Sequence, residues 1–190
     1  MNRFYDVCRG MCRKSLLSVI VLFSLFLGLQ SAYAQKAGSA QQIAVAKTLK
    51  PGIASIGIFC STLDDKAIET WTRAGMTLGV KVFIAKPTAM GEIAGLYHTL
   101  VKEKGVQIIL IPDAGDELMT GMGFEYLRQS ALSDQVGIFA PQEAMVTNGA
   151  FCCVTSEAGK LKVFVNQRIA QVIGANVPSD ATTTVTYVVR

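Results

Sequence analysis

The chain has 190 residues, of which 51% are hydrophobic and 17% are charged, and its net charge is +4. This composition is too apolar for a disordered protein and fits a single compact domain. Without the first 34 residues, 14 Lys and Arg face 13 Asp and Glu, so the net charge falls to +1. The balance excludes a basic surface for nucleic acid or an anionic bilayer, and we expect no nucleic-acid partner.

The first 34 residues have the pattern of a cleaved signal peptide. A basic stretch that ends at Lys14 precedes the apolar run 16–27, which is shorter than the ~20 residues needed to span a bilayer. The small-x-small pattern at residues 32–34 predicts cleavage after Ala34; the alternative is an uncleaved membrane anchor. We therefore expect an exported, periplasmic protein with a flexible lead at 35–41 and one domain at 42–190.

Short apolar runs alternate with amphipathic helical patterns through most of the remaining chain. Gly and Pro punctuate the segments, and Asp64, Asp116 and Asn166 stand where helices begin. The predicted helices cover 43–50, 64–79, 89–104, 116–132, 142–146 and 166–174, and the predicted strands cover 53–60, 80–84, 106–111, 136–140, 150–155, 161–165 and 182–189.

This alternation predicts right-handed β-α-β crossovers and a mostly parallel sheet. The fold class is α/β, a doubly wound sheet with the flavodoxin-like order 2-1-3-4-5. A hairpin through 157–159, a helix and an exposed edge strand complete the C-terminal part. In such sheets, ligands bind beyond the carboxyl ends of the strands.

Several segments resemble ABC-transporter substrate-binding proteins whose relatives take up aromatic amino acids. The segments are the run 53–59 after a Lys-Pro break, the helix end at 78–80, the strand end at 109–113 and the tail 160–178. The resemblance covers most of residues 45–180 and implies a periplasmic-binding-protein-like lobe of type I. Those proteins close two lobes, each about the size of this whole mature chain, around a ligand. Only one lobe is present here, so a second chain would have to complete the clamp.

The resemblance also implies a ligand site. Ser61, Thr62, Gln142 and Glu143 match positions from which the resembled family contacts its ligand. They follow the predicted strands 53–60 and 136–140, so each could instead be an ordinary polar loop residue.

Carboxylates follow the predicted strand 106–111. Asp113 and Asp116 could contact a ligand amine at this strand end. Alternatively, Asp116 and Glu117 favour the N-terminus of the next helix, and Asp113 shapes the turn before Gly115. We include Asp113 among the candidate ligand-binding residues.

The sequence contains no catalytic or cofactor motif that we recognise. His98 is the single histidine, so neither a metal site nor a general base for Cys60 or Ser61 is indicated. The turn after residues 53–60 has no glycine to cradle a phosphate. We expect a non-enzymatic protein without cofactor, metal or catalytic residues.

Three cysteines remain after the predicted cleavage: Cys60, Cys152 and Cys153. In the predicted strand order, Cys60 lies three interstrand steps, or ~14 Å, from the other two, twice the ~7 Å limit for a disulfide. Neighbouring residues of a strand point to opposite faces, so Cys152 and Cys153 cannot pair. We expect all three to be reduced, buried and structural. A thiol-redox protein would instead need an exposed thiolate with a lowered pKa.

These observations favour an exported solute-binding-like protein associated with ABC-type envelope transport. The alternative is a regulatory or scaffolding protein-protein module of the cell envelope that has lost solute binding. The expected partners are a small-molecule ligand, a membrane transporter or another envelope protein, and a second copy of the chain that recreates the two-lobed clamp.

The first prediction concerns processing. When the full chain is expressed in a bacterium with a periplasm, intact-mass measurement should find a protein in the periplasmic fraction that begins at Gln35. A variant with Ala32 and Ala34 replaced by Leu, which removes the small-x-small pattern, should remain uncleaved. An unprocessed wild-type N-terminus would contradict the prediction.

Overall fold

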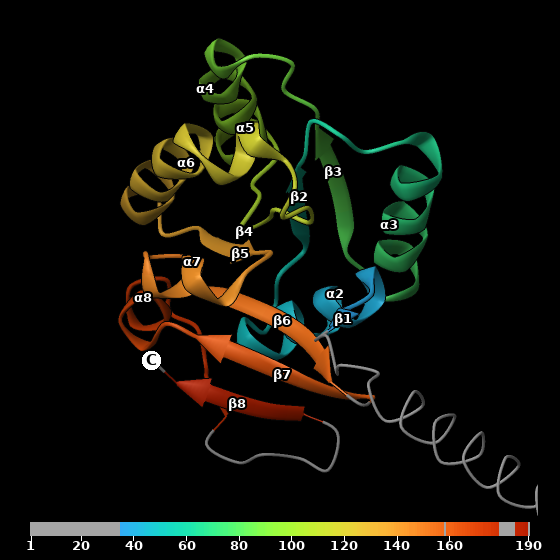
Figure 1. Cartoon of the computed structure of the whole chain (residues 1–190), viewed down its shortest axis with the longest axis vertical. Helices are drawn as coiled ribbons and strands as arrows, with labels where there is room; N and C mark the ends of the chain where they lie inside the picture. Colours follow the sequence, from blue (N-terminus) through green and yellow to red (C-terminus); the bar gives the residue numbers. More distant parts are fainter. Residues whose placement is uncertain (1–34, 158, 179–184, 190) are drawn as a thin grey trace, which may run out of the picture. The chain divides into compact units, whose positions relative to one another are not determined.

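The computed structural model describes residues 35–157, 159–178 and 185–189. The predicted signal peptide and the first part of the predicted edge strand lie outside the described residues. Helices and strands alternate along the chain, as expected (Figure 1). The first elements are β1 (Gln35–Lys36), α2 (Ser39–Leu49), β2 (Ser55–Phe59), α3 (Asp65–Thr77), β3 (Lys81–Ala85), α4 (Met90–His98) and the π-helical turn η1 (Thr99–Glu103).

The later elements include two short helices that follow β4 and β5. No helix in the described part of the chain is long and apolar enough to cross a membrane. The elements are β4 (Ile108–Leu110), α5 (Glu117–Thr120), α6 (Met122–Ser133), β5 (Gly137–Ala140), α7 (Glu143–Thr147), β6 (Cys152–Glu157), β7 (Lys160–Val165), α8 (Gln167–Val172) and β8 (Val185–Val189).

One sheet runs through the described chain in the order β3-β2-β4-β5-β6-β7-β8. The first five strands of this order are parallel, which confirms the predicted 2-1-3-4-5 arrangement. β7 pairs with β6 as the predicted hairpin, and β8 lies parallel to β7 at the edge. The α/β fold class and the doubly wound topology are therefore as the sequence predicted.

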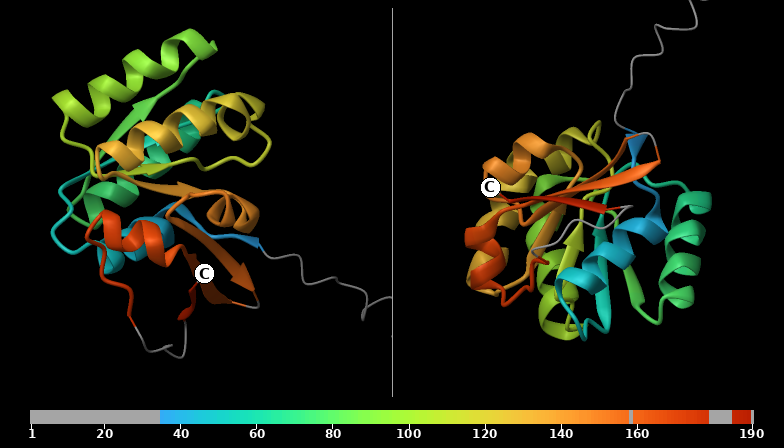
Figure 2. Two further views of the ribbon diagram at one scale, coloured as in Figure 1. Left: turned by 90° about the vertical axis from the view of Figure 1, so that its left-hand side faces the viewer. Right: turned by 90° about the horizontal axis from the view of Figure 1, so that it is seen from below.

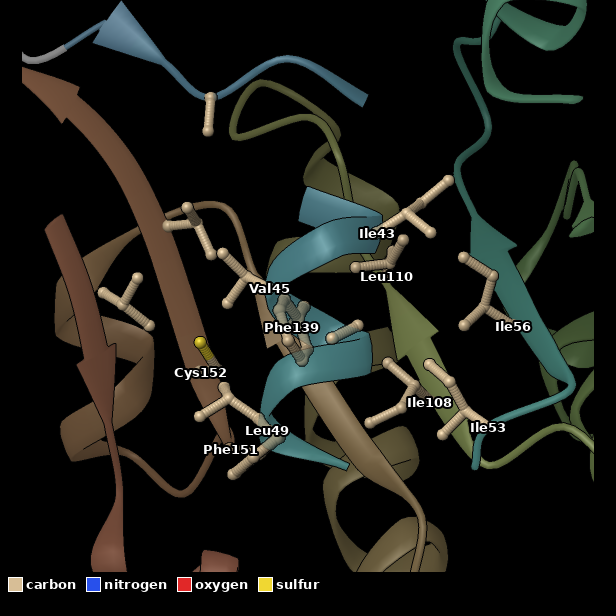
Figure 3. Close-up of a cluster of buried hydrophobic side chains, with 14 of the residues drawn as sticks. Ile43, Val45, Leu49, Ile53, Ile56, Ile108, Leu110, Phe139, Phe151 and Cys152 are labelled. Carbon is tan, nitrogen blue, oxygen red and sulfur yellow. The ribbon is translucent and has the colours of Figure 1, made fainter. Parts of the chain in front are cut away.

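The alternating side chains of the central strands enter two hydrophobic clusters, one on each face of the sheet. On one face, α2, α3 and α8 cover Ile56, Ile58, Leu110 and Phe139. Figure 3 shows Ile43 and Leu49 of α2 pointing into this cluster. On the other face, α4, η1, α5 and α6 cover a second cluster built around the residues between these, Phe59, Ile109, Ile111, Ile138 and Ala140. The helices of the two layers are seen on opposite sides of the sheet in Figures 1 and 2.

The structure corrects the expectation of a flexible lead at 35–41. Gln35 and Lys36 form β1, which pairs antiparallel with Ser156 and Thr155 of β6. The helix predicted from residue 43 begins at Ser39. Ala37 is buried at 2% exposure, and this tertiary contact orders a segment that has no apolar pattern of its own.

Two predicted helices are less regular than expected. The helix over 89–104 ends in η1; Tyr97 of α4 and Lys102 of η1 both donate to the carboxylate of Asp134, at 3.0 and 2.5 Å. The helix over 116–132 is divided at Gly121 into α5 and α6. Glycine favours such a break because it stabilises a helix poorly.

The three cysteines of the domain are free and buried, as predicted. Cys152 lies in the cluster under α2, whereas Cys153 packs with Val146 and Phe164 on the opposite face. Burial, with a smaller contribution from the Glu143 carboxylate, raises the pKa of the Cys153 thiol to about 12. The thiol is therefore protonated at neutral pH and serves as a small apolar side chain.

The second prediction compares two glycines that lie inside helices. A Cβ atom on Gly75 of α3 would lie 2.3 Å from Val82 Cγ2 and 2.7 Å from the Val80 carbonyl oxygen, whereas one on Gly95 of α4 would meet nothing within 4 Å. Gly75→Ala should therefore lower the free energy of unfolding by about 1–3 kcal/mol. Gly95→Ala should raise it by about 0.5–1 kcal/mol because alanine stabilises a helix better than glycine does. Urea unfolding measures both, and equal effects would contradict the packing of α3 on β3.

Candidate functional site

The carboxyl ends of β2 and β4 are joined by a buried carboxylate. Asp116 is 1% exposed and accepts hydrogen bonds from the Ser61 backbone N–H at 2.6 Å and from Ser61 Oγ at 2.8 Å. It also accepts from the Met119 N–H at 3.2 Å, which makes it the N-cap of α5. The predicted helix-start role of Asp116 is therefore confirmed, and a second role, holding Ser61, is added. Both the backbone N–H and the hydroxyl of Ser61 are therefore already hydrogen-bonded to Asp116.

A second pair of side chains joins the same two strand ends nearer the surface. Thr62 Oγ1 donates to Asp113 Oδ2 at 2.9 Å, and the Gly115 N–H donates to Asp113 Oδ1 at 3.0 Å. These two bonds, together with the charge of Lys36, hold the pKa of Asp113 below its usual value. The ionised Asp113 therefore stabilises the fold at pH values above the ordinary aspartate range, and this contribution is lost as the pH falls through the lowered pKa.

An open cleft of about 660 Å³ adjoins these strand ends, between the N-terminal ends of α2 and α3. We call it the strand-end cleft. Thr62 and Asp113 line it where β2 and β4 end, Lys36 and Gln42 line it from the N-terminal segment, and Asp64, Lys66 and Trp71 line it from α3. α3 follows the parallel strand β2, and helices in that position begin at the carboxyl edge of the sheet.

The structure brings together only part of the predicted site. Thr62 and Asp113 line the strand-end cleft, and Ser61 lies beside them on Asp116. Gln142 and Glu143 follow β5, one strand further along the sheet, and do not line this cleft. Gln142 is the exposed N-cap of α7, and its side chain makes no capping hydrogen bond; Glu143 is the half-buried first residue of that helix.

Several polar residues of the cleft were missed by the sequence reasoning, among them Lys36, Gln42 and Lys66. Lys36 and Gln42 belong to the N-terminal segment, which carries no strand pattern and only a weak helical one. Lys66 has the appearance of an ordinary charged residue on an exposed helix face. A Lys in the first turn of a helix is nevertheless unusual, because the helix dipole disfavours a cation there, and this was the available signal.

The described residues offer no arrangement for catalysis or metal binding. No group of three or more His, Cys, Asp or Glu residues within the described ranges could hold a metal ion. His98 is exposed on α4, with its Nδ1 atom 3.9 Å from Glu103 Oε1, away from the residues of the strand-end cleft. Burial raises the pKa of the Cys60 thiol, which makes it a poor nucleophile at neutral pH.

The fold recurs in solved structures of substrate-binding proteins. The ABC domain from Streptococcus pneumoniae in complex with L-Trp has a TM-score of 0.61 and 21% identity, over 75% of this chain and 57% of its own. A ligand-free, open substrate-binding protein with adhesive properties from Clostridium difficile has a TM-score of 0.63 and 16% identity, over 80% and 60% of the two chains. A conserved domain protein from Vibrio cholerae gives 0.63 and 14%, over 82% and 61%.

These similarities concern the fold. The chain has the α/β fold of an ABC-transporter substrate-binding protein, as the sequence resemblance implied, and it spans about three fifths of the length of the three structures. No family model and no curated protein matches the sequence. The shorter length agrees with a single periplasmic-binding-protein-like lobe.

The third prediction separates the two aspartates at the end of β4. Asp116→Ala removes the cap of α5 and leaves the half-buried Ser61 N–H without its acceptor, so the free energy of unfolding should fall by about 2–4 kcal/mol. Asp113→Ala removes bonds near the surface and should cost less than about 1 kcal/mol. Urea unfolding of both variants tests this. A larger loss for Asp113→Ala would make it the structural residue and remove it from the candidate ligand contacts.

Proposed function

We propose that this chain is an exported, non-enzymatic solute-binding-like protein associated with ABC-type transport in the cell envelope. A small molecule binds at the carboxyl ends of β2 and β4, where it contacts Thr62 and Asp113 and approaches Ser61. Gln142 and Glu143, at the end of β5, lie one strand further along the sheet and outside the cleft. The observation that carries the proposal is the pair of interstrand links, Ser61 to Asp116 and Thr62 to Asp113, which fix polar groups beside an open cleft.

The size and place of the strand-end cleft support binding of a small molecule. Its volume of about 660 Å³ lies within the ~300–1,000 Å³ typical of ligand pockets. It adjoins the carboxyl edge of a doubly wound sheet, where ligands of such folds bind. Fixed polar groups favour binding because little conformational entropy is lost when the ligand arrives. The complex of the Streptococcus pneumoniae domain with L-Trp shows that a protein of this fold can hold a small molecule.

A protein-protein module is the second candidate function. Met122 is 76% exposed and Met90 is 37% exposed, and they begin α6 and α4, two helices that contact each other on one face of the sheet. Exposed methionines are common on adaptable binding surfaces. Because the chain spans about three fifths of the length of its structural neighbours, such a surface could receive a second copy or another envelope protein.

The fourth prediction is a ligand-induced rise in thermal stability. Purified protein is screened against amino acids, organic acids, sugars and short peptides, and a true ligand at 100 times its dissociation constant should add ~2.7 kcal/mol to the free energy of unfolding. Asp113→Ala should weaken binding of that ligand while leaving the stability of the free protein nearly unchanged. Glu157→Ala, on the exposed end of β6, serves as the control and should bind like the wild type.

The same experiment separates the two candidate functions. If no compound shifts the transition, solute binding is contradicted, and the protein-protein module becomes the leading function. Sedimentation and crosslinking should then detect a dimer or a complex that Met122→Lys disrupts.

A further inference from the structure

The groups left free in the strand-end cleft are mainly hydrogen-bond donors. Asp64 Oδ1 already accepts from the Ala67 N–H at 2.7 Å as the cap of α3, and both oxygens of Asp113 accept bonds within the protein. The side chains of Lys36 and Lys66, in contrast, have no hydrogen bond or ion pair with any described residue. Lys36 is nevertheless near enough to Asp113 for its positive charge to contribute to the lowered pKa of that carboxyl group. The carboxylates are thus partly satisfied, whereas the two ammonium groups are not.

The N-terminus of α2 adds further unsatisfied donors to the same cleft. Its first intrahelical bond is donated by the Gln42 N–H, so the preceding N–H groups of the first turn have no partner within the helix. Its N-cap is Gly38, which provides no side-chain cap, and its first turn contains no acidic residue. Other helices in the described chain, such as α3 and α5, have an Asp at this position. The positive end of α2 therefore lacks an anion.

Gln42 independently indicates a ligand. It is only 7% exposed, and its Nε2 donates to the Ala37 carbonyl at 2.8 Å, which fixes the amide in place. Its Oε1 accepts no hydrogen bond from the described residues. Because no fully buried side-chain oxygen in the described ranges lacks a partner, this atom is not fully buried, and Gln42 is one of the residues that line the strand-end cleft. A fixed amide that lines a cleft and keeps an acceptor without a partner among the described residues can receive a donor from a bound molecule.

From these groups we propose that the strand-end cleft binds a small hydroxylated oxyanion, a sugar acid or a related hydroxycarboxylate. Its carboxylate lies between Lys36, Lys66 and the N-terminus of α2. Its hydroxyl groups donate to Gln42 Oε1 and face the carboxylates of Asp64 and Asp113. This inference rests on the proposed solute-binding function and names its ligand class. A bare anion has no hydroxyl group that could donate to the two aspartates. A neutral sugar has no negative charge that could pair with the two lysines. Neither satisfies both the donors and the acceptors of the cleft.

Four probes of similar chemistry test the assignment by calorimetric titration of the purified protein. Gluconate carries hydroxyls and a negative charge, glucose carries hydroxyls alone, acetate carries the charge alone, and glucosamine carries hydroxyls with a positive charge. Gluconate should bind at least about tenfold more tightly than each of the others, and its affinity should fall as salt is added. Tighter binding of glucosamine would overturn the proposal, because the aspartates would then dominate the cleft.

Charge-removing variants locate the site. Lys36→Gln and Lys66→Gln should each weaken gluconate binding about tenfold, the factor expected when a charge-assisted hydrogen bond is lost. Lys81→Gln is the matched control: Lys81 is exposed at the start of β3, the opposite end of the strand from the cleft, so this variant should bind like the wild type. Gln42→Glu keeps the side-chain length but adds a negative charge beside the ligand, so it should weaken binding further. Circular dichroism confirms that each variant is folded.

Two results distinguish a failure of this inference from a failure of the proposed function. The first result is that gluconate does not bind, or binds equally well to Lys36→Gln, Lys66→Gln and Lys81→Gln, while another compound in the thermal screen does bind. In that case the ligand class is wrong and solute binding stands. If no probe and no screened compound binds, both proposals fail.

Discussion

The carboxyl edge of the sheet depends on one buried carboxylate. Asp116 is almost fully removed from water, and a charge in that position is tolerated only where hydrogen bonds replace its hydration. Its three donors come from two segments, the loop after β2 and the first turn of α5. β2 and β4 are neighbours in the sheet, ~4.8 Å apart. The hydrogen bonds of Asp116 therefore hold the segments that follow these two strands in a fixed position relative to each other. The loop that carries Asp113 is fixed as a consequence, and Thr62 and the strand-end cleft follow from it.

The opposite wall of the cleft is fixed by the N-terminal segment. β1 adds two residues to β6, Ala37 is buried, and the Gln42 amide closes back onto Ala37. Ile43 and Leu49 then place α2 over the central strands (Figure 3). The polar groups near the start of α2 are thus held by the hydrophobic packing of its later residues. Such a wall would favour affinity in the proposed site, because few side chains have to be ordered when a ligand binds.

The sequence was sufficient to predict the strand order, because the apolar runs are short, follow helical segments and end in clear turn residues. Asn166, predicted to cap a helix, does accept from the Ile169 N–H at 3.1 Å. Features that depend on distant contacts were not predictable. No local pattern orders residues 35–41, since their structure comes from β6 and from the core. The division of the 116–132 helix at Gly121 was marked only by glycines that a helix can also tolerate.

The candidate site was less predictable from the sequence than the fold was. Sequence position alone placed Ser61, Thr62 and Asp113 at strand ends, and the topology then brought them together. It could not show that Ser61 is bound to Asp116, which lies 55 residues away, nor that Thr62 is bound to Asp113. Gln142 and Glu143 also follow a strand, yet the cleft is lined by residues at the ends of β2 and β4, by the N-terminal segment and by α3. Which strand ends share a cleft is decided by the helices packed above them, and that information is spread over the whole core.

A single lobe places a physical constraint on any ligand. Pockets that bind small molecules tightly cover most of the ligand surface, and an open cleft on one lobe leaves one side of the ligand in water. Apolar burial therefore contributes less here than in a clamp of two lobes, and fixed polar groups must supply more of the affinity. Charge-assisted hydrogen bonds are the strongest polar contacts available, so in the proposed site Lys36 and Lys66, which have no ion pair within the described part of the chain, are the residues best able to make up the difference. A second chain that closed over the cleft would strengthen the same contacts by excluding water, and would thereby raise affinity without changing which ligand is recognised.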